Sequence, residues 1–173
     1  MDCACTYYNS VAAGALQTDN GSNAAAAVAT LSVSKAATSG PPNVSKFFYP
    51  AQIDPGATTT LKIKLGNPNP MAALLTAPFI DVLPSGVVVF GLPGNVPSNT
   101  CGGTLTATKG SSKVILTGGK IPANGGCALT VIVRAATAGT YVNRLGVGVL
   151  KTNKGNNVTG YSATLTVTKS AGT

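Results

Sequence analysis

The sequence of 173 residues predicts an all-β protein, built as an antiparallel β-sandwich with an extra β-hairpin at the N-terminal end. Three observations predict this fold. Apolar and polar residues alternate in short runs, which places them on opposite faces of strands. Turns rich in Gly, Pro and Asn separate these runs at regular spacing, as in sandwiches. A segment of about thirty residues near the C-terminus also has a second copy near the N-terminus.

The clearest strand lies at residues 58–66, which read TTTLKIKLG. Leu61, Ile63 and Leu65 fall on one face and Lys62 and Lys64 on the other, so we expect one buried and one wet face. Further strands are expected at 86–91, 104–108, 113–117, 127–135 and 163–168. An alanine run at 23–29 is a weak helix signal, and we discount it because the chain continues in strand alternation.

The repeat sets the domain boundaries. Residues 6–35 align without a gap to residues 140–169, and thirteen of thirty positions are identical. The constant offset of 134 residues has the size of an immunoglobulin-like domain. We therefore expect a complete immunoglobulin-like sandwich over residues 44–173. Residues 1–35 would be an orphan hairpin that copies the end of another such unit, and residues 36–43 a linker.

The orphan hairpin needs a partner, because a two-stranded ribbon alone is marginally stable in water. We expect it to dock on a neighbouring subunit and extend or complete its sheet. Such a head-to-tail contact is heterologous and generates a filament unless it closes a ring. Gly40-Pro41-Pro42 would act as a semi-rigid spacer. The alternative is that the chain is a fragment cut inside the preceding repeat.

Composition argues against an enzyme. Only 9% of residues are charged, there is no Glu, His or Trp, and the acids are four scattered aspartates. Histidine-based triads and zinc sites are excluded, and we expect no cofactor and no metal site. The net charge of +8 comes from dispersed lysines, which favours solvated strand faces over nucleic-acid binding. An anionic cell wall or another polyanion is the alternative partner. No apolar run is long enough to span a membrane.

Several short motifs resemble a known family when they are taken in order. They are residues 46–50 (KFFYP), 53–56 (IDPG), 67–69 (NPN), 81–86 (DVLPSG), 101–104 (CGGT), 119–122 (GKIP), 125–127 (GGC), 139–143 (GTYVN) and 163–167 (ATLTV). Residues 44–169 resemble the conserved repeat domain, an immunoglobulin-like domain of bacterial cell-surface and exported proteins. The resemblance implies secretion, a structural or adhesive role, no catalytic residues, and a disulfide between Cys101 and Cys127.

The remaining cysteines depart from that family. Cys3 and Cys5 align with Thr137 and Gly139, and they are two residues apart on an expected strand. Such residues point to the same face and are poorly placed to bond each other. We therefore predict that Cys3 or Cys5 forms an intersubunit disulfide.

Two further chemical hypotheses concern Asp81 and the aromatic residues. Asp81 could assist an intramolecular bond between Asn143 and Lys62 or Lys64. The aromatic residues Tyr7, Tyr8, Phe47, Phe48 and Tyr49 could form a sugar-binding strip, although core packing is the commoner fate of strand aromatics. The function we expect is a structural subunit or repeat module of an extracellular fibre or sheath. The alternative is a cell-surface adhesin or carbohydrate-binding module that contacts glycans or the cell wall.

Overall fold

A computed structural model describes residues 5–33, 39–94 and 98–169 of the chain. All of its regular structure in these ranges is β-strand, which confirms the predicted all-β sandwich. The chain divides into two compact units, residues 1–37 and residues 38–173.

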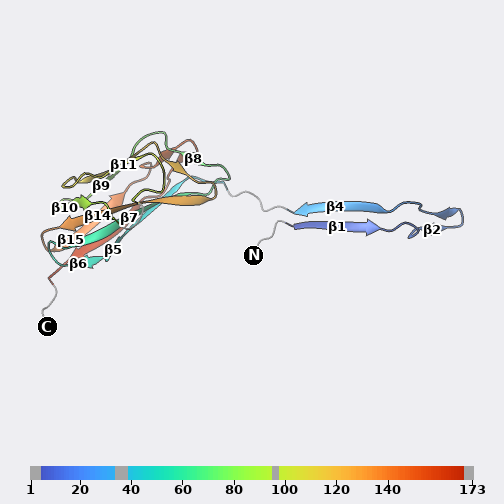
Figure 1. The fold of residues 1–173 in the computed structure, drawn as a ribbon, viewed down its shortest axis with the longest axis horizontal. Helices are drawn as coiled ribbons and strands as arrows, with labels where there is room; N and C mark the ends of the chain where they lie inside the picture. The colour runs from blue at the N-terminus through green and yellow to red at the C-terminus, as the bar shows by residue number, and fades with distance from the viewer. Residues whose placement is uncertain (1–4, 34–38, 95–97, 170–173) are drawn as a thin grey trace. The chain divides into compact units, whose positions relative to one another are not determined.

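The first unit is a hairpin (Figure 1). Strand β1 (Cys5–Val11) pairs antiparallel with β4 (Ala27–Val33), and the tip carries the two-residue strands β2 (Gln17–Thr18) and β3 (Gly21–Ser22). Every residue of β4 is exposed. The described residues of β4 therefore bury no core within the hairpin.

The second unit contains three larger sheets (Figure 1). The first has the order β10 (Val87–Gly91), β14 (Gly125–Ala135), β7 (Thr58–Asn67) and β5 (Asn43–Tyr49). The second has the order β11 (Thr104–Thr106), β12 (Lys113–Thr117) and β9 (Phe79–Val82). The third has the order β15 (Gly139–Leu145), β18 (Tyr161–Val167) and β6 (Gln52–Ile53).

Short strand pairs complete the unit. They are β8 (Ala73–Leu74) with β13 (Lys120–Ile121), and β16 (Lys151–Thr152) with β17 (Gly155–Asn156). The named strand pairs run antiparallel except β18 with β6, which is parallel. Strand β18 lies close to β5, and β15 lies close to β9, so the three sheets enclose one core.

The core follows the period-two pattern of the strands. Leu61, Ile63 and Leu65 are fully buried on β7, as the alternation predicts. Leu129, Val131 and Val133 lie beside them on the same face of the sheet, on β14, and Leu165 from β18 joins the same cluster. Burying each of these side chains is worth roughly 1.5–3 kcal/mol relative to exposure.

The expected linker 36–43 ends on the second unit. The carbonyl oxygen of Gly40 accepts a hydrogen bond of 2.9 Å from Nδ2 of Asn69. Pro42 is buried, and Asn43 already pairs with Gly66 of β7. Residues 40–43 therefore belong to the sandwich rather than to a free spacer.

The two copies of the repeat share one local structure. In β1–β4 Asn9 pairs with Ala29, and in β15–β18 Asn143 pairs with Ala163 in the same register. At each tip one asparagine accepts from a leucine N–H and donates to two carbonyl groups, as Asn23 does in the first copy and Asn157 in the second. The hairpin sequence thus specifies its own turn without help from a core.

Candidate functional site

The second unit buries one charged cluster in its core, formed by Lys46, Asp81 and Asn143. Each residue occupies an inward-facing position of a strand. Lys46 alternates with exposed Phe47 on β5, Asp81 follows buried Phe79 on β9, and Asn143 precedes buried Leu145 on β15. Strand β9 lies close to β15, and β5 lies close to β18, which pairs with β15. The three separate strands β5, β9 and β15 therefore bring these side chains together.

The geometry centres on the Asp81 carboxylate. Nζ of Lys46 donates to Oδ1 at 2.8 Å, and Nδ2 of Asn143 donates to Oδ2 at 2.9 Å. Asp81 and Asn143 have no exposed surface, and Lys46 is 1% exposed. Oδ1 of Asn143 is buried without a hydrogen-bond partner. Buried polar atoms are normally satisfied, so this oxygen is an exception that calls for an explanation.

The cluster is electrostatically unusual because both charges are removed from water. Burial lowers the pKa of Lys46 below its ordinary value, and the negative charge and hydrogen bond of Asp81 oppose that shift. Replacing a buried ion pair with apolar residues often leaves the folded state equally stable or more stable. Stability alone therefore does not explain why this pair is buried.

The structure changes one partner of the predicted bond. Asp81 and Asn143 do come together, as hypothesised, but the lysine beside them is Lys46. Lys62 and Lys64 were the wrong choice because they lie on the outer face of β7, where Lys62 is half-buried and Lys64 exposed. The missed signal was in the sequence: Val44, Lys46 and Phe48 alternate, which places a lysine on an apolar face.

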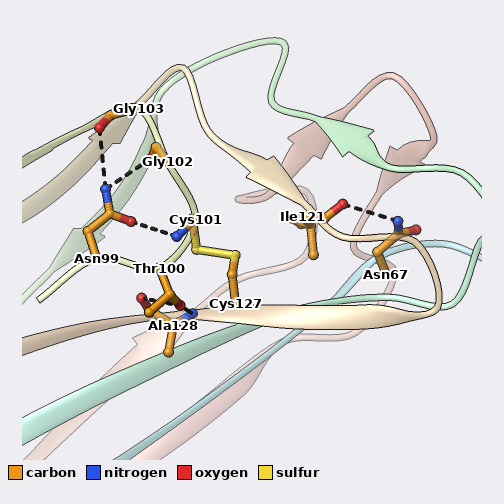
Figure 2. Close-up of a disulfide and its surroundings, with 9 residues drawn as sticks. All are labelled: Asn67, Asn99, Thr100, Cys101, Gly102, Gly103, Ile121, Cys127 and Ala128. Carbon is orange, nitrogen blue, oxygen red and sulfur yellow. Dashed lines mark hydrogen bonds between the residues drawn. A yellow bond between two sulfur atoms is a disulfide. The ribbon is translucent and has the colours of Figure 1, made fainter. Parts of the chain in front are cut away.

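The predicted disulfide between Cys101 and Cys127 is present, with a Cα–Cα distance of 5.0 Å (Figure 2). Cys127 lies on β14, and Cys101 lies in the loop before β11. Oδ1 of Asn99 accepts from the Cys101 N–H at 2.8 Å, and Thr100 Oγ1 accepts from the Ala128 N–H at 2.8 Å. The disulfide closes a loop with a sequence separation of 26. Restricting the unfolded chain in this way is worth about 3.5 kcal/mol.

The tight turn after Cys101 requires glycine. Gly103 has a φ of 68°, and a Cβ atom there would overlap the carbonyl oxygens of Thr117 and Gly118. Asn99 holds the same turn, because its Nδ2 donates to the Gly102 carbonyl at 3.0 Å (Figure 2). Cys3 and the side chain of Cys5 lie outside the described residues, so their intersubunit disulfide stays a prediction.

The expected aromatic strip divides between the two faces of β5. Phe48 is 4% exposed and belongs to the core, which removes it from any sugar-binding surface. Phe47 and Tyr49 are exposed on the outer face, beside a shallow depression of about 890 Å³ that Lys62 also lines. Tyr7 and Tyr8 are exposed on the hairpin unit.

Within the part of the chain that the structure describes, no three potential metal ligands of the His, Cys, Asp and Glu types gather. The same residues include no helix that could cross a membrane.

Comparison with known proteins gives one family and several distant structural similarities. A bacterial hydrophobin, described as "Crystal structure of BslA", is 20% identical, covers 78% of this chain and 99% of its own, and has a TM-score of 0.44. A non-cellulosomal cohesin from the archaeon Archaeoglobus fulgidus is 11% identical, covers 75% and 93%, and has a TM-score of 0.46. At these TM-scores neither similarity carries information about function.

A search of curated proteins gives no match. The conserved repeat domain that the motifs resemble is not the family that matches, and that resemblance stays a prediction. The family that matches spans residues 42–167, which is the whole sandwich from the start of β5 to the end of β18. The chain belongs to the family described as "Domain of unknown function (DUF7933)".

Proposed function

We propose that the protein is a structural module of an extracellular fibre or sheath, which assembles head-to-tail through its N-terminal hairpin. The observation that carries this proposal is the exposed apolar face of that hairpin. In the register of β1 with β4, one face contains Tyr7, Asn9, Val11, Ala29, Leu31 and Val33, which we name the copied core face.

The second copy shows what this face is built for. Asn143, Leu145, Ala163, Leu165 and Val167 are the counterparts of residues on the copied core face, and all of them are buried. Leu165 has no exposed surface, whereas its counterpart Leu31 is 62% exposed. A sequence that preserves core residues on a surface gains stability when another surface covers them.

The proposed occupant is a second copy of this chain. A hairpin that docks by its copied core face on a neighbouring subunit forms a heterologous contact. Repetition of such a contact produces an open filament. The disulfide between Cys101 and Cys127 supports an extracellular location, since disulfides persist in oxidising compartments. The absence of catalytic motifs from the sequence supports a non-enzymatic role.

Light scattering and negative-stain imaging test the assembly. We expect the full chain to form filaments or large oligomers, and Leu31→Glu to remain monomeric because a charge on the copied core face opposes burial. Thr30→Glu is the matched control, since Thr30 lies on the opposite face of β4. A full chain that stays monomeric, or a Leu31→Glu variant that assembles normally, would contradict the proposal.

A glycan-binding role is the second candidate. Phe47, Tyr49 and Lys62 line the depression on the outer face of the four-stranded sheet, and sugar sites commonly combine aromatic and polar side chains. Tyr49 is 75% exposed, so Tyr49→Ala leaves the core intact. Binding of the monomeric Leu31→Glu chain to a glycan array, with loss of binding in Leu31→Glu/Tyr49→Ala, would favour this candidate.

A further inference from the structure

We propose that Lys46 and Asn143 become joined by an intramolecular amide bond, with the Asp81 carboxyl group transferring the protons between them. The inference rests on the geometry of the buried cluster and is independent of the assembly proposed above. A single carboxylate holds both reacting side chains, at 2.8 Å from Nζ of Lys46 and at 2.9 Å from Nδ2 of Asn143. The two reacting groups are thus confined side by side within one core.

The reaction balances without any external reactant. The Lys46 ammonium gives one proton to Asp81, which leaves a neutral amine with a free electron pair. Nζ attacks Cγ of Asn143, so an Nζ–Cγ bond forms and the Cγ–Nδ2 bond breaks. Asp81 passes this first proton to Nδ2, which leaves as ammonia. The attacking Nζ then gives a second proton to Asp81, which passes it to the ammonia. The products are one amide bond, one ammonium ion and the Asp81 carboxylate. Nothing is oxidised or reduced.

The surroundings favour each step. Burial disfavours the charged form of Lys46, and an amine desolvated in this way is an activated nucleophile. Holding both reactants on one carboxylate replaces a bimolecular encounter, which accelerates reactions of this type strongly. The complete burial of Asp81 and Asn143 also keeps water, the competing nucleophile, away from Cγ.

The unsatisfied oxygen of Asn143 fits the same scheme. Oδ1 has no hydrogen-bond partner while Asp81 is a carboxylate, because a carboxylate can only accept. Nδ2, which is the leaving nitrogen, lies 2.9 Å from Oδ2 of Asp81, so the carboxyl group can deliver a proton to it.

Mass spectrometry of the full chain tests the bond. We expect the reduced, unfolded protein to weigh about 17 Da less than its sequence, because one ammonia is lost when the lysine amine displaces the amide nitrogen. Trypsin cleaves after Lys and Arg but not after a lysine whose amine is acylated. The digest should therefore contain a branched peptide that joins residues 36–62 to residues 135–144.

Matched variants separate this bond from other reactions. Lys46→Arg and Asn143→Ala remove the nucleophile and the electrophile, so both should keep the full mass. Asn9→Ala and Lys62→Ala should still lose ammonia, because Asn9 is the exposed copy of Asn143 and Lys62 lies outside the core. Asn20-Gly21 and Asn124-Gly125 could lose ammonia through a succinimide, which the branched peptide excludes.

The folded wild-type chain decides the question even if a core variant fails to fold. An unmodified mass after prolonged incubation would overturn the proposal, and so would a mass loss that maps to residues other than Lys46 and Asn143. A branched peptide that contains Asn9 instead of Asn143 would also overturn it, because the electrophile would then lie outside the buried cluster.

Discussion

Lys46 occupies a position that an apolar residue would normally take on an inward-facing strand. Its neighbours on the same face of β5 are Val44 and Phe48, and both are buried. Asp81 and Asn143 stand at equivalent positions on β9 and β15. Removing either charged partner, Lys46 or Asp81, would leave an uncompensated buried charge, which costs about 3–5 kcal/mol. The two charged residues are therefore required together.

The pH dependence of stability gives a prediction at this scale. In the unbonded Asn143→Ala chain, Lys46 keeps its amine, and burial holds its folded pKa below the ordinary value of 10.5. The unfolded chain then binds more protons in the window below pH 10.5, so the free energy of unfolding rises with pH through that window. Asp81 is the charged group that contacts Lys46 there.

The wild-type chain should lack this rise, because an amide nitrogen does not titrate. Urea unfolding across that window measures both slopes, and the other titrating groups cancel in the comparison. Equal slopes in the wild type and in Asn143→Ala would contradict the bond.

Residue-scale roles were partly predictable from the sequence. Asp81 and Asn143 stand out because a carboxylate and an amide in apolar strands require partners. The lysine was harder to identify, because period-two alternation assigned Lys62 and Lys64 to one face but could not say which strands meet across the core. That choice depends on the packing of β5, β9 and β15, which are far apart in the sequence.

At the scale of elements, the two copies of the hairpin allow the effect of local hydrogen bonds on stability to be compared with and without tertiary packing. Asn23 and Asn157 make the same three hydrogen bonds at the two tips. Asn157 is buried against the sandwich, whereas Asn23 lies in a hairpin without a core. The same three hydrogen bonds are thus formed once in a buried site and once in a site without a core.

This pair gives a matched prediction. Asn157→Ala leaves buried backbone groups unsatisfied and should lower the stability of the sandwich by about 2 kcal/mol or more. Asn23→Ala should leave the unfolding midpoint of the sandwich unchanged, because its groups can bond to water. Denaturant unfolding measures both, and a similar loss in the two variants would show that the sandwich and the hairpin unfold together.

Element boundaries followed from local chemistry more closely than the pairing of strands did. The alternation over residues 58–66 predicted β7 (Thr58–Asn67), and residues 127–135 predicted most of β14 (Gly125–Ala135). The short β6 and its parallel pairing with β18 carry no local signal, since two residues show no periodicity. The gap-free repeat predicted the hairpin, because two related segments in the same register form the same turn.

At the scale of the whole molecule, the proposed bond connects two strands near opposite ends of the sandwich sequence. Lys46 lies in the first strand of the unit, and Asn143 lies in β15, near its end. A pull along the chain would pass from residue 46 directly to residue 143. The 96 residues between Lys46 and Asn143, which include the disulfide loop, would carry no tension. A module built in this way suits a fibre that is stretched.

Single-molecule pulling on the full chain, under reducing conditions, tests this account of a covalently closed structural module most directly. In Asn143→Ala, unfolding should release the segment between Lys46 and Asn143, which adds roughly 330 Å of extended chain. The wild-type chain should unfold without that extension, because the amide bond bypasses the segment. Equal extensions in the wild type and in Asn143→Ala would contradict the account.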